Sequence, residues 1–256
     1  MEAPSALIVV PARAEKEAEL DPLLQTLAAL RATAPEAMVL VVDRSPAAHA
    51  AMLELAAGEL DCAYVVHGEG ETHSSSLNVG LVAAAGHGMD ACLFAGGLVP
   101  DPGWLRRLQA RTGADGEPAA VAGAAVIEPT GLIRQAGYFF SLFRRAWSAR
   151  LARVPEILLD VQPPLLCPLS SEVQLIRREW IDRVGVYDEE LEGANAALDY
   201  CLRVSGEDGQ CVLEPTVRVR AVQAGDGEPE DTDASARRLR VKHANMSFQP
   251  WVPEVL

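Results

Sequence analysis

The residues of this chain that could do chemistry are a few carboxylates and arginines that follow hydrophobic segments. Asp43 ends the run Met38–Asp43, which predicts a buried strand. Ligands of α/β proteins bind at the carboxyl ends of parallel strands, so we expect Asp43 to face a cleft. Arg13 follows an earlier apolar run, residues 6–10, that ends at Pro11. Its guanidinium could contact a phosphate, and a solvated surface arginine is the plainer alternative.

The histidines and cysteines form no recognisable site in the sequence. No two of the five histidines, and no two of the five cysteines, stand at the spacing of metal ligands. The glycine-containing segments at residues 86–88 and 96–97 lack both the pattern and the lysine of a phosphate-binding P-loop. We therefore expect no metal site and no bound cofactor. The cysteines are interpreted as buried free thiols in a reducing compartment.

Bulk composition narrows the class of protein. With 256 residues, 49% of them hydrophobic, the chain can form one large α/β domain with a substantial core. A net charge of −14 argues against a nucleic-acid partner, which needs a basic face, and against docking on anionic lipid. No apolar run approaches the roughly 18 residues of a membrane span. We expect a cytoplasmic protein without a transmembrane segment or secretion signal.

Predicted strands and helices alternate through the first half of the chain. Apolar runs predict strands at residues 6–10, 38–43, 62–66 and 91–95. Helical periodicity predicts helices at residues 15–30, 47–60, 74–86 and 102–111. This alternation implies a Rossmann-like α/β fold, with a mainly parallel central sheet flanked by helices. Later strands are expected at 119–127, 172–177 and 217–222, and short helices at 179–184 and 196–204.

The most specific pattern lies at residues 93–105, Leu-Phe-Ala-Gly-Gly-Leu-Val-Pro-Asp-Pro-Gly-Trp-Leu. It resembles the centre of a family-2 glycosyltransferase, where a hydrophobic strand runs into an acidic metal motif and then a helix start. Six further motifs resemble segments of that family in the same order. They are Val9-Val10-Pro11, Val41-Val42-Asp43-Arg44-Ser45, Asn78-Val79-Gly80 and residues 131–137, 175–189 and 199–203. Residues 248–251 are similar to a tail seen in some members.

The resemblance covers nearly the whole chain and implies the type A glycosyltransferase fold. It implies one domain over residues 1–256, with a nucleotide-binding half (1–115), an acceptor-side half (116–230) and a C-terminal tail (231–256). It also implies a nucleotide sugar as ligand, with Asp43 accepting hydrogen bonds from the base, and a glycan or lipid-linked acceptor. The nucleotide-binding residues that it implies are Pro11, Arg13, Asp43, Asn78 and Gly80. A homo-oligomer, or a partner protein from glycan biosynthesis, is a further expectation.

The chain departs from the family at the metal motif. Ala95, Gly96 and Gly97 stand where the family carries acidic residues, and their side chains offer no oxygen ligand to Mg²⁺ or Mn²⁺. Asp101 aligns beyond the motif, and an aspartate before proline often merely starts a helix. We therefore predict that nucleotide binding is insensitive to divalent metal. Basic side chains such as Arg13, Arg177 or Arg178 would then replace the charge of the cation.

A second departure concerns the base that removes the acceptor's proton. Ala197 stands at the position of the family's base, and Asp199 is the one carboxylate left of that motif. Asp199 is either a replacement base or acceptor-orienting group, or a structural residue that bonds backbone amides at a helix start. Two functions stay open: a metal-independent sugar transferase, and a catalytically degenerate domain that acts as a binding or assembly module in a glycan-building complex. An unrelated Rossmann-type enzyme is disfavoured, because no glycine-rich phosphate turn follows the first strand.

Overall fold

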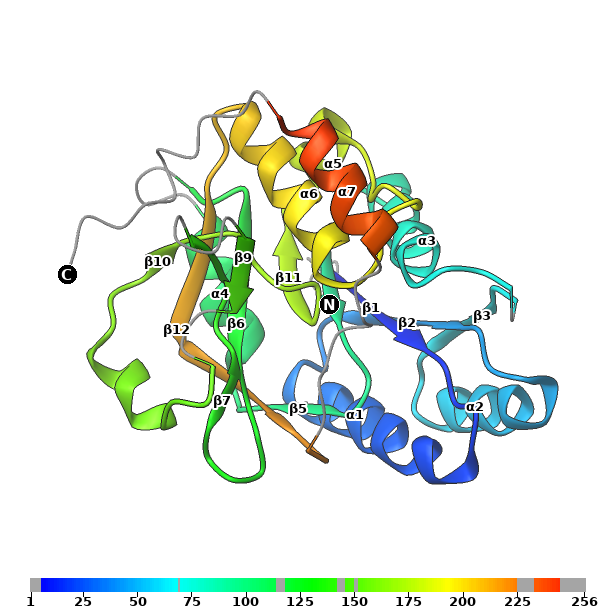
Figure 1. Cartoon of the computed structure of the whole chain (residues 1–256). Helices are drawn as coiled ribbons and strands as arrows, with labels where there is room; N and C mark the ends of the chain where they lie inside the picture. Colours follow the sequence, from blue (N-terminus) through cyan, green and yellow to red (C-terminus); the bar gives the residue numbers. More distant parts are fainter. Residues whose placement is uncertain are drawn as a thin grey trace.

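The computed structural model describes residues 6–68, 70–113, 118–141, 146–149, 152–224 and 233–244. These residues form an α/β fold in which a large sheet carries helices on both faces (Figure 1). No helix in these ranges is long and apolar enough to span a membrane.

The first half of the chain is a parallel α/β unit. Its strands, all parallel in the order β3-β2-β1-β4, are β1 (Ala6–Ala12), β2 (Met38–Asp43), β3 (Ala63–Val66) and β4 (Asp90–Phe94). The connecting helices are η1 (Glu17–Glu19), α1 (Leu20–Thr33), α2 (Ala47–Glu59) and α3 (His73–Gly86). The chain runs from β1 outward to β3 and then returns to the other side of β1 to form β4. The topological switch point, where such sheets bind ligands, is therefore between β1 and β4.

The second half extends this sheet with strands of both directions. Its elements are β5 (Leu98–Pro100), α4 (Trp104–Thr112), β6 (Val121–Ile127), β7 (Ile133–Gln135), β8 (Tyr138–Ser141), β9 (Ala146–Ala149), η2 (Glu156–Val161), β10 (Leu165–Leu166), β11 (Val173–Ile176), α5 (Arg178–Val184), α6 (Gly193–Gly206), β12 (Cys211–Ala221) and α7 (Asp233–Lys242). The main path of the sheet is β10-β12-β6-β11-β4-β1-β2-β3, and β8 and β9 form a separate hairpin. β11 lies antiparallel between β4 and β6. The expected parallel arrangement holds for the first four strands and for the β6–β12 pair, while β11 makes the whole sheet mixed.

Two apolar layers hold the helices against the sheet. Along β1, Leu7 and Val9 face the layer that contains buried residues of α3, α5 and α6. Ile8 and Val10 face the opposite layer, which contains buried residues of α1, α2 and α4. This alternation follows from the two-residue period of a strand. Figure 1 shows α3, α5, α6 and α7 together on one side of the sheet, and α1 and α2 on the other.

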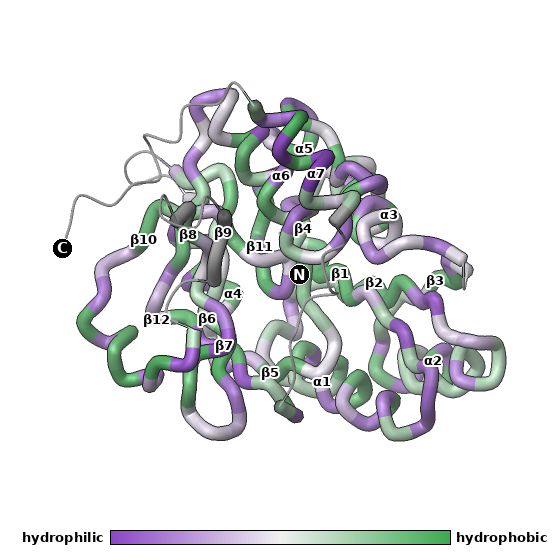
Figure 2. The backbone as a smooth tube through the Cα atoms, in the orientation of Figure 1, coloured by the Kyte–Doolittle hydropathy of each residue, from purple (hydrophilic) through white to green (hydrophobic). Residues whose placement is uncertain are grey.

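Helix α7 is one of the elements that the sequence did not predict. Its residues were expected in the C-terminal tail (231–256), and the helix carries one buried apolar side chain, Leu239. Figure 2 shows α7 largely in the hydrophilic colour, in contrast to the strands of the sheet. Polar contacts hold α7 against α6 and against the segment that precedes α6. The hydropathy pattern of a sequence does not predict such polar contacts. The similarity noted at residues 248–251 lies outside the described residues.

Candidate functional site

A cleft of about 340 Å³ opens at the carboxyl ends of β1 and β4, at the switch point of the sheet. It is lined by Pro11, Arg13, Glu19, Pro22, Leu23, Arg44, His73, Ala95, Gly96, Gly97, Arg134 and Gln223. Residues that follow β1, β2 and β4 therefore meet side chains from α1, α3 and β7. This position makes the cleft the best candidate for a ligand site.

Another cavity, of about 610 Å³, lies at the opposite end of the sheet. Asp90, Arg177 and Arg178 line it, and the backbone N–H of Arg178 donates to Asp90 Oδ1 (2.9 Å) at the start of β4. Arg177 and Arg178, suggested from the sequence as replacements for the charge of a metal, therefore do not line the switch-point cleft. Both residues lie at the amino end of β4, whereas Ala95 follows its carboxyl end.

Three arginines line the cleft, and they differ in how they are neutralised. Arg134 Nε donates to Glu128 Oε1 (2.5 Å), and its Nη1 lies 3.2 Å from Glu172 Oε1. Arg13, which is half exposed, pairs with Glu15 on the rim (Nη2–Oε1, 2.5 Å).

Arg44 makes no ion pair within the part of the chain that the structure describes. Its Nη1 donates to the carbonyl of Glu71 (2.9 Å), and its Nε is buried without a hydrogen-bond partner there. Arg44 is thus the cation of the cleft whose charge is least compensated.

Burial and neighbouring charge set the protonation of two groups in the cleft. Burial lowers the pKa of Arg44, and the charge of Arg13 lowers it further, against the opposite effect of Asp43. Burial and the charge of Arg44 lower the pKa of His73 to about 4. His73 is therefore neutral at pH 7, and its ring can accept one hydrogen bond and donate another.

The segment Ala95–Gly97 lines the cleft and offers no side-chain oxygen to a metal. A Cβ at Gly96 would lie 2.1 Å from Leu23 Cδ2, so Leu23 of α1 lies where a side chain at this position would begin. Gly97 has a φ of +78°, a left-handed conformation that other residues adopt at a cost. In the described ranges, no three histidine, cysteine, aspartate or glutamate side chains gather as metal ligands. The divalent metal that the fold family implies does not fit these residues.

Pro11 and Arg13 line the cleft, and their contact with a nucleotide remains a prediction; Asp43 does not line it. Asp43 ends β2 as expected, but its carboxylate is buried. Its Oδ1 accepts from the backbone N–H of Ser45 (2.8 Å), and its Oδ2 accepts from the Tyr64 hydroxyl (2.5 Å). The expectation that Asp43 faces the cleft is therefore not met for this cleft, because local partners hold the carboxylate. Its contact with a nucleotide base remains a prediction.

Asn78 and Gly80, whose predicted contact with a nucleotide remains a prediction, connect parts of the fold. The Asn78 side chain donates to the carbonyl of Tyr187 (3.0 Å) and accepts from its N–H (2.8 Å), which ties α3 to the loop before α6. At Gly80 a Cβ would lie 2.2 Å from Val9 Cγ1, so this glycine allows α3 to pack closely on β1. Neither residue is among those that line the cleft.

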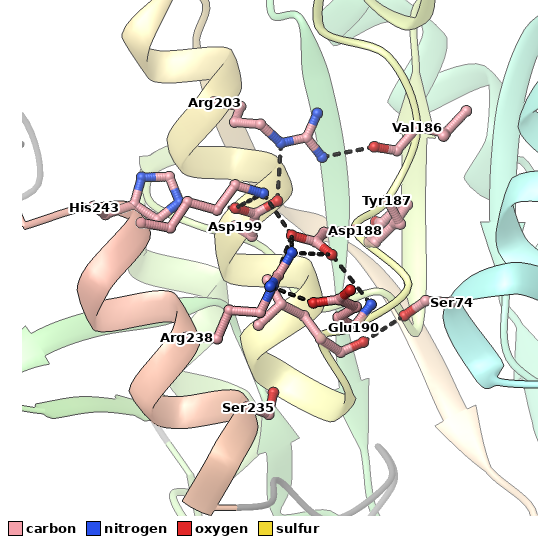
Figure 3. Close-up of polar contacts among 12 residues, drawn as sticks. Ser74, Val186, Tyr187, Asp188, Glu190, Asp199, Arg203, Ser235, Arg238 and His243 are labelled. Carbon is pink, nitrogen blue, oxygen red and sulfur yellow. Dashed lines mark hydrogen bonds and ion pairs between the residues drawn. The ribbon is translucent and has the colours of Figure 1, made fainter.

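Asp199, the candidate base, lies inside a cluster of cations on α6 and α7 (Figure 3). Its fully buried carboxylate contacts Arg203 Nε, Lys242 Nζ and His243 Nε2, each at 2.8 Å. Burial raises its pKa, but these partners outweigh burial and lower the pKa to about 2. A carboxylate so buried and so weakly basic does not suit a general base. The structural alternative needs correction as well, because Asp199 lies within α6 and holds α7 rather than capping a helix start.

The sequence analysis missed Arg44, His73 and Arg134 as cleft residues. Arg44 stands directly after Asp43, inside the motif of residues 41–45. A basic side chain directly after a predicted strand was the signal in the sequence that could have identified it. His73 and Arg134 lie far from it in the sequence, and only the fold brings them together.

Comparisons with known proteins agree with this architecture. No protein-family model and no curated protein sequence matches the chain. The chain is similar to the crystal structure of GalNAc-T7 with UDP, GalNAc and Mn²⁺, with a TM-score of 0.67 and 15% identity over 99% of this chain and 57% of that chain. It is also similar to the mannosyltransferase PcManGT from Pyrobaculum calidifontis in complex with GDP-Man and Mn²⁺, with a TM-score of 0.55 and 17% identity over 94% of this chain and 62% of that chain. The chain thus has the type A glycosyltransferase fold and spans about three fifths of the length of these two proteins.

Proposed function

We propose that the protein binds a nucleotide sugar in the switch-point cleft and transfers its sugar to a glycan or lipid-linked acceptor without a divalent metal. The observation that carries the proposal is the cationic cleft at the carboxyl ends of β1 and β4, which places Arg13 and Arg44 where α/β sheets bind ligands. The two similar structures, described as complexes with UDP and with GDP-Man, support the nucleotide-sugar class.

The metal-free part of the proposal rests on the segment after β4. Ala95, Gly96 and Gly97 supply no oxygen side chain, and Leu23 fills the space beside Gly96. The two similar structures contain Mn²⁺, so this chain would differ from them in how it neutralises the ligand. Arginine is well suited to that task, because its planar guanidinium can bind two phosphate oxygens at once.

Sugar transfer from a nucleoside diphosphate leaves negative charge on the departing diphosphate. Fixed cations in a site of low dielectric stabilise such developing charge more strongly than water does. In this chain Arg44 and Arg13 would provide this stabilisation, while neutral His73 would donate or accept a hydrogen bond.

A second candidate function is a degenerate transferase domain that binds a nucleotide sugar and transfers nothing. The observation that favours it is the loss of the base. Ala197 is buried at the base position, and Asp199 is held by Arg203, Lys242 and His243. The domain would then serve as a binding or assembly module in a glycan-building complex.

Calorimetric titration with UDP-, GDP- and dTDP-sugars, in EDTA and then with Mn²⁺, tests the proposal. We expect saturable binding of at least one of them, with less than a tenfold difference in affinity between the two conditions, about 1.4 kcal/mol. Tenfold or stronger dependence on Mn²⁺ would contradict the metal-free part, and no binding at all would contradict both candidate functions. Release of nucleoside diphosphate in the presence of glycan or lipid-linked acceptors then separates a transferase from a binding module.

A further inference from the structure

We infer that Arg44 is the main receptor for the diphosphate of the ligand, and that its buried guanidinium takes over the electrostatic task of a metal ion. This inference rests on the proposed nucleotide-sugar site and assigns the groups that recognise the phosphates. Arg13 is the second cation of this diphosphate receptor, at the rim of the same cleft.

The first observation is that Arg44 is buried and makes no ion pair with any residue that the structure describes, although the charge of Asp43 raises its pKa from nearby. It is 7% exposed, and among the residues placed by the structure its only side-chain hydrogen bond is to the Glu71 carbonyl. Buried cations are normally paired, because removing a charge from water is costly. An anionic ligand in the cleft would supply the missing counter-ion and would accept a hydrogen bond from the unpartnered Nε.

The second observation is that the fold fixes the position of Arg44. Its backbone N–H donates to the carbonyl of Ala12 (2.9 Å), which ties the end of β2 to the end of β1. The backbone of Arg44 is therefore held by the sheet, and the hydrogen bond to the Glu71 carbonyl holds its guanidinium in the cleft. A receptor fixed in advance loses little conformational entropy on binding.

The third observation is that a second, accessible cation lies near the first. The charge of Arg13 lowers the pKa of Arg44, which indicates that the two guanidinium groups are close enough to repel. A ligand with two adjacent anionic groups relieves this repulsion better than one with a single negative charge. Arg134 contributes less, because Glu128 and Glu172 already neutralise it. The arrangement therefore favours a diphosphate over a single carboxylate.

Titration with inorganic pyrophosphate in EDTA, at fixed ionic strength, tests the assignment directly. We expect Arg44→Gln to weaken pyrophosphate binding at least tenfold and Arg44→Lys to weaken it less. Added Mn²⁺ should not restore pyrophosphate binding in either variant. Arg13→Gln should cause a smaller loss, because the Arg13 side chain is half exposed and already paired with Glu15. Arg178→Gln is the matched control, since this half-exposed arginine lies at the opposite end of β4, and it should change the affinity less than twofold.

Melting temperature separates this role from a structural one. Arg44→Gln removes an unpaired buried charge, so the variant should melt at or above the temperature of the wild type. A variant that binds pyrophosphate as well as the wild type would overturn the inference, as would one that loses binding only because it unfolds. Nucleotide-sugar binding unchanged in Arg44→Gln would overturn this inference and leave the proposed function standing. Pyrophosphate binding through Arg44 without any nucleotide-sugar binding would support the anion receptor and contradict the proposed function.

Discussion

Asp199 stands two residues after Ala197, the position at which the resemblance in the sequence places a base, and in this fold it joins α6 to α7. Its carboxylate contacts Arg203 from its own helix and Lys242 and His243 from the end of α7 (Figure 3). Asp188 adds a second carboxylate to the same end of α7, since it also pairs with Lys242 (2.8 Å). Asp199 is an aspartate, a residue type that can act as a catalytic base, but in this fold its contacts hold two helices together.

The expected effect of Asp199→Asn follows from this network. Asp199→Asn removes the charge of the buried carboxylate that pairs with Arg203 and Lys242, and breaking a buried ion pair costs about 3–5 kcal/mol. For a domain of this size that corresponds to a loss of about 6–20 °C in melting temperature. Thermal unfolding of the variant measures this loss.

Asp61→Asn is the matched control, because Asp61 is exposed and pairs with Arg31 at 3.2 Å. A surface pair of this kind contributes about 0–1 kcal/mol, so the control should melt close to the wild type. Loss of sugar transfer in Asp199→Asn without a change in melting temperature would instead restore the catalytic interpretation.

Among the elements, α3 shows how a motif that resembles a binding sequence can serve packing. Gly80 faces β1, where Val9 occupies the space that a Cβ would need. Val9 is β-branched and fully buried, so it cannot turn aside as a long flexible side chain could.

We therefore expect Gly80→Ala to destabilise the protein by about 1–3 kcal/mol through overpacking, despite the higher helix propensity of alanine. Val9→Ala should partly restore stability in the double variant, because it removes the two methyl groups that clash. Gly58→Ala in α2 is the control: a Cβ there meets nothing within 4 Å, and it should stabilise by about 0.5–1 kcal/mol. Chemical denaturation measures all three, and additive effects of the Val9 and Gly80 changes would contradict the packing argument.

The elements also differ in how far the sequence predicts them. β1, β2 and β4 are apolar runs flanked by periodic helices, so pattern and propensity agree and the predicted ranges lie within a few residues of the observed ones. α7 has little apolar surface, and contacts such as Lys242 with Asp199 become visible only when distant segments are placed together. The same reason hides the cleft, because Arg44 and Arg134 are 90 residues apart and share no local motif.

Across the whole molecule, the cleft takes side chains from helices on both faces of the sheet, α1 and α3, whereas the α6–α7 cluster lies on one face. The cleft opens beside α1, whose Leu23 lies where a side chain at Gly96 would begin. The α6–α7 cluster lies on the opposite face, where carboxylates bind cations of the same chain (Figure 1). The pKa values of Asp188, Asp199 and Glu214 are all lowered, in each case because hydrogen bonds and nearby cations outweigh burial. The stability of the protein is therefore linked to pH through these carboxylates.

The sign of this linkage predicts acid sensitivity. A carboxyl group whose pKa is lower in the folded than in the unfolded chain stabilises the fold above its unfolded pKa, about 3.9 for aspartate. That stabilisation is lost as the pH falls toward the folded pKa, which for Asp199 is about 2. Its full contribution is about 2–3 kcal/mol, of which about 1 kcal/mol is lost between pH 5 and pH 3. Asp90 acts in the opposite direction, because burial raises its pKa.

Measuring the melting temperatures of the wild type and of Asp199→Asn over a range of pH isolates the contribution of Asp199 to the pH dependence of stability. The difference between their melting temperatures should shrink by about 2–4 °C as the pH falls from 5 to 3, because protonated aspartate resembles asparagine in charge. Glu214 and Asp90 titrate in both proteins, so their effects cancel in the difference. Asp188 shares Lys242 with Asp199, so the difference reports the pair of carboxylates on this lysine. A gap that stays constant over this range would show that Asp199 does not hold α7 through its charge. A gap that widens would reverse the sign of the linkage and exclude a lowered pKa in the folded state.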